Sequence, residues 1–175
     1  NRVREETADP LDPADTLREQ NPLGKMPSLL IGNEAFFDSH VILEMIDAIA
    51  GGGVLLPAEG LARYRVQTRA RLADGITDAA LTVTYETRFR TPDQMSERWL
   101  DHQRGKIRRG LSAFETEPVD PEKLNLISIT LAACLGYLDW REPITWRSEF
   151  PGIARWLDVF AAAQPVWAAT ERELA

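Results

Sequence analysis

Apolar and polar positions follow two different patterns along the chain. Before residue 51 the apolar runs are short and alternate with polar residues, as they do over residues 28–37. After residue 60 apolar residues recur at intervals of three and four, which is the spacing of amphipathic helices. The Gly-rich stretch GGGVLLPAEG at 51–60 separates the two patterns, and it predicts a linker between two domains.

The first region begins with a short helix and a hairpin. The stretch LDPADTLREQNP predicts the helix, with Asp12 as its N-cap and Pro13 at its first position. Residues 28–31 and 34–37 flank Gly32-Asn33, a pair that tolerates positive φ, and they predict a β-hairpin.

A helix is predicted next, from about residue 40 to residue 50, with Asp38-Ser39 at its N-terminal cap. Its apolar residues share one side, which we expect a sheet to cover. This apolar stripe is Val41, Ile42, Met45, Ile46 and Ile49.

The second region predicts an all-α domain. One long helix ends before Thr91-Pro92, and another covers about 93–115. The stretch LNLISITLAACLGYL is apolar almost all round, so we expect it to be buried at the centre of a helical bundle. Two more helices are predicted from PGIARWLDVFAAA and from the residues after Pro165.

Composition narrows the class of protein. The 175 residues include 20 Lys and Arg against 27 Asp and Glu, a formal charge of −7, which disfavours a nucleic-acid partner. No apolar run approaches the roughly 20 residues that span a bilayer, so we expect no membrane segment. The single cysteine, Cys134, can form no disulfide within the chain and fits the reducing cytoplasm. His40 and His102 lack the spacing of paired metal ligands, so no metal is expected.

The Met26-Pro27 bond precedes the first predicted strand. An X-Pro bond can be cis, which bends the chain and exposes the N–H and C=O of the residue before proline. Such an exposed pair can hold a peptide-like ligand as an added strand. The alternative is a trans proline that starts the strand.

Asp38-Ser39 offers a second candidate site. A helix N-terminus attracts a carboxylate, the Ser39 hydroxyl can donate to it, and Asp38 can pair with an ammonium group. An α-amino acid carries both groups. The alternative is a plain N-cap. The two sites together fit a ligand with an amino-acid end and a peptide backbone, such as glutathione (γ-Glu-Cys-Gly).

The stretch NPLGKMPSLLIGNEAFFDSHVILEMID resembles the NPxGKVPxL…(E/D)S…I segment of glutathione S-transferases. The similarity continues through LLPAEGLARYRVQ, ARLADGITDAAL and YLDWREPITWRSEFPGIARWLDVFAAAQPVWAAT, and it is closest to bacterial members. It implies a two-domain glutathione S-transferase fold. Residues 1–50 would form a thioredoxin-like α/β domain, 51–60 the linker, and 61–175 an all-α domain.

The resemblance also implies how glutathione is bound. Met26 would bind the cysteinyl backbone through its own N–H and C=O, with Pro27 cis. Asp38 and Ser39 would hold the γ-glutamyl end, and Lys25 would lie near the glycine carboxylate.

In the second domain, the resemblance places Asp78, Tyr85 and Arg88 at the pocket for a small electrophile. It implies a homodimer as well, in which the long helix faces the partner subunit. This helix carries Arg63, Arg65, Arg69 and Arg71, and the alternative is that these arginines simply face solvent.

The chain departs from the family pattern in two places. Its first residues match the family's second strand, so we expect the first strand and helix upstream of Asn1. The alternative is a fragment with a damaged first domain. The Ser, Tyr or Cys that activates the thiol would lie there too, so no catalytic residue is assigned. The central helix begins Asn125-Leu126-Ile127-Ser128, which keeps the N-cap but lacks the acidic residue of a capping box.

The function implied is a glutathione transferase, in which the thiolate attacks electrophilic substrates. A non-catalytic glutathione-binding or structural homologue is one alternative. A glutathione-dependent disulfide or thiol transferase is another, if the activating residue is cysteine.

Overall fold

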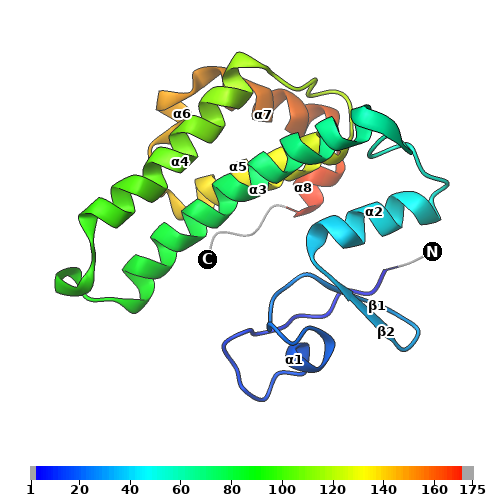
Figure 1. Cartoon of the computed structure of the whole chain (residues 1–175), viewed down its shortest axis with the longest axis horizontal. Helices are drawn as coiled ribbons and strands as arrows, with labels where there is room; N and C mark the ends of the chain where they lie inside the picture. Colours follow the sequence, from blue (N-terminus) through cyan, green and yellow to red (C-terminus); the bar gives the residue numbers. More distant parts are fainter. Residues whose placement is uncertain (1–2, 171–175) are drawn as a thin grey trace. The chain divides into compact units, whose positions relative to one another are not determined.

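The computed structural model describes residues 3–170, except the side chains at 166 and 169 (Figure 1). The chain divides into two compact units, Asn1–Leu55 and Leu56–Ala175. This division falls inside the segment 51–60, while the bounds 1–50 and 61–175 for the two domains stay a prediction.

The first unit contains a two-stranded antiparallel sheet. Strand β1 (Ser28–Ile31) pairs with β2 (Glu34–Phe37), so that Ser28 lies opposite Phe37 and Ile31 lies opposite Glu34. Gly32, in the turn between them, has φ +61°, which glycine adopts without steric cost. The predicted hairpin is confirmed.

The short helix before the hairpin starts later than predicted. Helix α1 is a single turn, Leu17–Gln20, and the prediction of Asp12 as its N-cap is wrong. The carboxylates of Asp9, Asp12 and Asp15 each accept the backbone N–H two residues ahead, at 2.9, 2.8 and 2.7 Å. These local turns compete with the helical hydrogen-bond pattern, and they keep residues 9–16 out of the helix.

Helix α2 (Ser39–Ile49) follows β2, but it does not bury the predicted stripe. Val41, Ile46 and Ile49 are exposed, Ile49 to 64%, and the buried side chains include His40 and Asp47. The prediction that a sheet covers this whole apolar stripe is therefore wrong for this structure.

The burial of Asp47 has a local cause. Its carboxylate accepts the backbone N–H groups of Gly53, Val54 and Leu55 at 3.0, 3.0 and 2.8 Å. The chain reaches this carboxylate through three glycines in a row, Gly51 to Gly53, with φ of +105°, +75° and +80°. Glycine suits such a turn because it has no Cβ to clash. The segment after α2 is thereby folded back onto the helix.

The second unit is a bundle of helices, as predicted. Its members are α3 (Gly60–Phe89), the 3₁₀ turn η1 (Pro92–Gln94), α4 (Glu97–Thr116), α5 (Leu126–Arg141), α6 (Trp146–Glu149), α7 (Pro151–Ala163) and α8 (Val166–Thr170). The long helix α3 packs against α4 and α5 (Figure 1).

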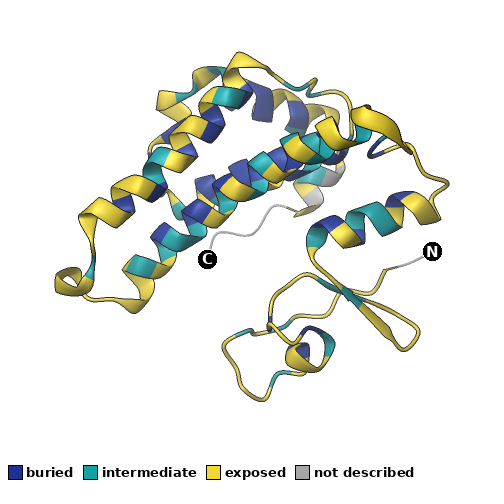
Figure 2. Cartoon of the chain, viewed as in Figure 1, coloured by how far each residue is buried: buried dark blue, intermediate teal, exposed yellow. Residues whose placement is uncertain are grey.

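The core of this unit lies between the inner faces of the helices (Figure 2). Helix α5 contributes fully buried leucines, Leu131, Leu135 and Leu138, and this confirms it as the central helix. Helices α3 and α4 approach closely because α4 has a glycine at the crossing. A Cβ added to Gly110 would collide with the Ile76 side chain.

The N-terminus of α5 carries a complete capping box, so the expectation of an incomplete one is wrong. The Asn125 side chain accepts from the N–H groups of Ile127 and Ser128 at 2.9 and 3.0 Å. In return the Ser128 hydroxyl accepts from the Asn125 N–H at 2.9 Å. Serine therefore takes the role that the sequence pattern reserves for an acidic residue.

No helix within the described part of the chain has the length and apolar character to cross a bilayer.

Candidate functional site

The Met26-Pro27 peptide bond is cis, as the sequence resemblance implied. It lies two residues before β1, and Met26 is 52% exposed. Among the described residues, the backbone N–H and C=O of Met26 have no hydrogen-bond partner. They remain available to an extended peptide.

Asn21, which sequence reasoning did not single out as a site residue, shapes the turn that leads to Met26. It is 2% exposed, and its amide donates to the Lys25 carbonyl at 2.8 Å and accepts the Leu23 N–H at 3.0 Å. Gly24 completes the turn with φ +59°. The signal was present in the Asn-Pro-x-Gly sequence, which is rich in turn-forming residues.

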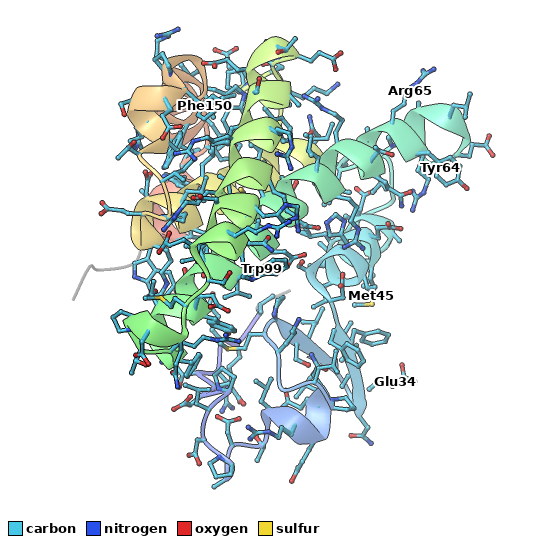
Figure 3. All side chains as sticks on the ribbon, turned by 60° about the vertical axis from the view of Figure 1, so that its left-hand side comes forward. Glu34, Met45, Tyr64, Arg65, Trp99 and Phe150 are labelled. Carbon is cyan, nitrogen blue, oxygen red and sulfur yellow. The ribbon has the colours of Figure 1, made fainter. Side chains whose placement is uncertain are left out.

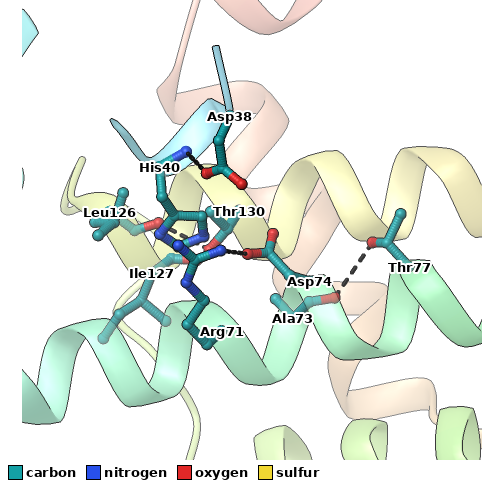
Figure 4. Close-up of polar contacts among 9 residues, drawn as sticks. All are labelled: Asp38, His40, Arg71, Ala73, Asp74, Thr77, Leu126, Ile127 and Thr130. Carbon is teal, nitrogen blue, oxygen red and sulfur yellow. Dashed lines mark hydrogen bonds and ion pairs between the residues drawn. The ribbon is translucent and has the colours of Figure 1, made fainter. Parts of the chain in front are cut away.

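Asp38 is the N-cap of α2, and its carboxylate accepts the His40 N–H at 3.0 Å (Figure 4). Its φ is +72°, which is uncommon for a residue other than glycine. Strained backbone of this kind clusters at ligand sites. Ser39 follows as the first residue of the helix and is partly exposed.

The hairpin register brings these two candidate sites together. Ser28 lies opposite Phe37 at the end of the ladder, so the next pair outward is Pro27 and Asp38. Residues opposite each other in an antiparallel pair have Cα atoms about 5 Å apart. Met26, Pro27, Asp38 and Ser39 therefore gather at one end of the hairpin, with Lys25 exposed just before them.

This end of the hairpin offers complementary groups. It has a free peptide edge at Met26, and the positive N-terminal pole of α2 lies at Ser39. Asp38 supplies a negative charge beside that pole. The arrangement can hold a molecule that has a peptide backbone, a carboxylate and an ammonium group.

Two family models match the chain. One, described as glutathione S-transferase, N-terminal domain, matches residues 2–49, and the other, glutathione S-transferase, C-terminal domain, matches residues 97–159. A crystal structure of a glutathione transferase family member from Pseudomonas fluorescens Pf-5, with bound glutathione, is 39% identical. The similarity covers 97% of this chain and 84% of that one, with a TM-score of 0.87. The chain belongs to the glutathione S-transferase family.

Two further relatives support this membership. A glutathione S-transferase from Methylobacillus flagellatus KT, crystallised with glutathione bound, is 29% identical, covers 95% of this chain and 85% of its own, and has a TM-score of 0.83. The uncharacterized GST-like protein YibF of Escherichia coli K12 is 40% identical over 126 residues, which is 69% of this chain. That match spans 62% of the length of YibF.

The family fold of a thioredoxin-like domain plus a helical domain is thus confirmed.

The remaining predicted site residues lie in the helical unit. Asp78, Tyr85 and Arg88 fall on one side of α3, at helical spacing, and all three are exposed. Tyr85 meets the Phe89 ring edge to face at 5.4 Å, and the Arg88 guanidinium lies 5.4 Å from the same ring.

The arginines at the start of α3 are largely engaged within their own unit or linker. Arg63 donates to the Pro57 carbonyl at 3.1 Å, and Arg71 pairs with Asp74 at 3.4 Å (Figure 4). Arg69 caps the end of α4 by donating to the Glu117 carbonyl at 2.5 Å. Arg65 is exposed and projects away from the helix (Figure 3).

Cys134 is the single cysteine of the chain and belongs to the core of the helical unit. It is buried in α5, and burial raises the pKa of its thiol to about 12, although the nearby Thr77 acts to lower it. The thiol therefore stays protonated at neutral pH. Within residues 3–170 no three His, Cys, Asp or Glu side chains are grouped as a metal site would need.

Proposed function

We propose that this protein is a glutathione S-transferase that binds glutathione at the end of the hairpin and uses its thiolate against electrophilic substrates. The observation that carries the proposal is the register of β1 and β2, because it places the open Met26 backbone beside the α2 N-terminus. Glutathione bound in the structures of similar proteins supports the choice of ligand.

Each residue has a proposed role. Met26 forms two backbone hydrogen bonds with the cysteinyl residue of glutathione, and Pro27 holds the bend that exposes it. Ser39 and the first N–H groups of α2 bind the γ-glutamyl carboxylate, while Asp38 pairs with the ammonium. Lys25 lies near the glycine carboxylate.

The chemical step is nucleophilic substitution or addition. The glutathione thiol loses its proton to a base, and the sulfur forms a C–S bond with an electrophilic carbon. A leaving group departs with the electron pair, or the pair moves into the acceptor and is protonated there. A hydrogen-bond donor that stabilises the thiolate increases its fraction at neutral pH.

We further propose that Asp78, Tyr85 and Arg88 contribute to the electrophile pocket, and that the enzyme works in the cytoplasm as a homodimer. The exposed aromatic rings of Tyr85 and Phe89 suit an apolar substrate, and Arg88 suits one with a negative charge.

The ligand site is tested by calorimetric titration of the full chain with glutathione. Ser39→Ala removes one hydrogen bond to a carboxylate, so we expect the dissociation constant to rise about tenfold. Ser112→Ala, an exposed serine of α4, is the matched control and leaves binding unchanged. Absence of binding by the unmodified protein, or equal affinity in Ser39→Ala, contradicts the proposal.

Turnover separates an enzyme from a binding protein. A panel of aryl halides, epoxides and α,β-unsaturated carbonyls is assayed with glutathione, and a mixed disulfide is included for the disulfide-exchange alternative. Glutathione binding without turnover on any of them would leave a non-catalytic glutathione-binding protein.

A further inference from the structure

Helices α3 and α5 pack against each other and run in the same direction (Figure 1, Figure 4). Thr77 on α3 lies against the Cys134 thiol on α5, and this contact gives the register of the pair. Both helices advance about 1.5 Å per residue, so positions seven residues further on, at Thr84 and Arg141, are level again. The last turns of the two helices therefore lie close together.

Three polar side chains of these last turns are directed into the contact between the helices. Arg88 follows Thr77 by eleven residues, which is about three turns, so it lies on the α5 side of α3. Tyr137 and Arg141 follow Cys134 at intervals of three and four residues, which puts them on the α3 side of α5. We call Arg88, Tyr137 and Arg141 the α3–α5 cluster.

Two atoms of this cluster are buried without a hydrogen-bond partner among the described residues. They are the Nε of Arg141 and the hydroxyl oxygen of Tyr137. Buried polar groups in proteins nearly always have a partner, so such an exception calls for a bound ligand or an ordered water. Both groups can donate a hydrogen bond, and the arginine is always charged. They suit a ligand with an anionic acceptor.

The positive charges of the cluster are not neutralised within the described part of the chain. No carboxylate of residues 3–170 forms an ion pair with Arg88 or Arg141. The carboxylates of Glu86 and Asp139 pair with other arginines, at 3.4 and 2.6 Å. The negative pole of a helix C-terminus favours a cation there, but it leaves the buried Nε of Arg141 unpaired.

Aromatic rings flank the cluster on both helices. On α3 Tyr85 meets Phe89 edge to face at 5.4 Å, and on α5 Tyr137 meets Trp140 edge to face at 6.0 Å. The guanidinium of Arg141 stacks on the Trp140 ring, 3.3 Å from its centroid. Tyr85, Phe89 and Trp140 are all exposed. Rings of this kind offer apolar contact to the body of a ligand.

We propose that the α3–α5 cluster selects electrophiles that carry a carboxylate on an apolar or aromatic body. Arg141 and Tyr137 donate hydrogen bonds to the carboxylate, and Arg88 adds a second positive charge. This inference rests on the proposed function, because Arg88 belongs to the proposed electrophile pocket. It adds Tyr137 and Arg141 of α5 to that pocket and names the class of substrate.

Two matched substrates test this preference, 4-chloro-3-nitrobenzoate and the neutral 4-chloro-3-nitrobenzamide. In both, the thiolate sulfur forms a bond to the chlorinated ring carbon, chloride leaves with the electron pair, and the thiol proton passes to the solvent. The kcat/KM of each substrate is divided by the rate constant of its uncatalysed reaction with glutathione, because the two rings differ in reactivity. We expect the unmodified protein to favour the carboxylate about tenfold on this scale.

Variants of the cluster identify the residues responsible. Arg141→Gln removes the charge and should abolish the preference, while Tyr137→Phe removes only the hydroxyl and should reduce it about threefold. The readout is the ratio between the two substrates, because a merely structural role would lower turnover of both alike. Arg155→Gln, at an exposed position of α7, is the matched control and leaves the ratio unchanged.

Titration calorimetry with the two glutathione conjugates, S-(4-carboxy-2-nitrophenyl)glutathione and its carboxamide analogue, separates the inference from the proposed function. If neither substrate is turned over but the carboxylated conjugate binds more tightly, and Arg141→Gln removes the difference, the transferase activity fails and the inference stands. Equal affinity for the two conjugates overturns the inference, as does a preference that survives in both Arg141→Gln and Tyr137→Phe. An equal loss of preference in Arg155→Gln also overturns it.

Discussion

Asp47 shows how one residue can organise a segment that has little apolar support. Its carboxylate is 5% exposed and receives three backbone hydrogen bonds, from Gly53, Val54 and Leu55. Hydrogen bonds to an ionised acceptor are stronger than neutral ones. Since much of the apolar side of α2 is exposed, these bonds are a main link between the helix and the chain that follows it.

We predict that Asp47→Ala destabilises the first unit by about 3 kcal/mol, because it leaves backbone N–H groups without their acceptor. Hydrogen–deuterium exchange of residues 50–56 measures the effect, and those amides should exchange much faster. Asp47→Asn keeps one acceptor oxygen, so its exchange rates should lie between those of the unmodified protein and those of Asp47→Ala. Val41→Ala, at an exposed position of the same helix, is the control. Unchanged protection in Asp47→Ala would show that the loop is held by other contacts.

Sequence patterns identify many residues of the candidate site but not the way they are supported. Met26, Pro27, Asp38 and Ser39 were found because X-Pro bonds and helix caps have local signatures. Asp47 was missed because its backbone partners lie six to eight residues away, where no local rule names them. Asn21 was missed although its bond to the Leu23 N–H is a local turn of a kind that asparagine favours. The strand register then decided which of these pieces lie together.

At the scale of elements, helix caps determine where the helices begin. The predicted start of α1 failed because three aspartates each form a turn with their own neighbouring backbone. The start of α5 was correct, but its capping box was misjudged because serine fills the acidic position. Both cases depend on which of two hydrogen bonds a short polar side chain makes.

The capping box of α5 provides a quantitative test. Asn125→Ala removes the acceptor for two N–H groups and should lower the free energy of unfolding of the helical unit by about 1–2 kcal/mol. Ser128→Ala should cost about 1 kcal/mol, and Asn125→Asp, which keeps an acceptor, should cost little. Denaturant titration followed by circular dichroism measures all three. If Asn125→Asp lowers the free energy of unfolding as much as Asn125→Ala does, the cap requires the amide group itself.

At the scale of the whole molecule, the two units differ in how much apolar surface they bury. The hydrophobic core residues of the helical unit run from Ala73 to Phe160, and this unit was predicted well because helical periodicity extends over long segments. Among the described residues of the first unit, the buried apolar side chains are Leu17, Ile42 and Leu55. Its short elements leave less periodic signal, and its outer residues are exposed.

This difference predicts that the two units unfold separately. All five tryptophans lie at position 99 or later, so their fluorescence reports only on the helical unit, while hydrogen exchange of β1, β2 and α2 reports on the first unit. We expect the first unit to unfold at the lower denaturant concentration, because burial of apolar surface is the main source of stability. Glutathione at 100 times its dissociation constant should stabilise the first unit by about 2.7 kcal/mol. It should not change the denaturant midpoint of the tryptophan signal, which reports on the helical unit. A single transition, seen at the same denaturant concentration by both probes, would instead show that the units fold as one.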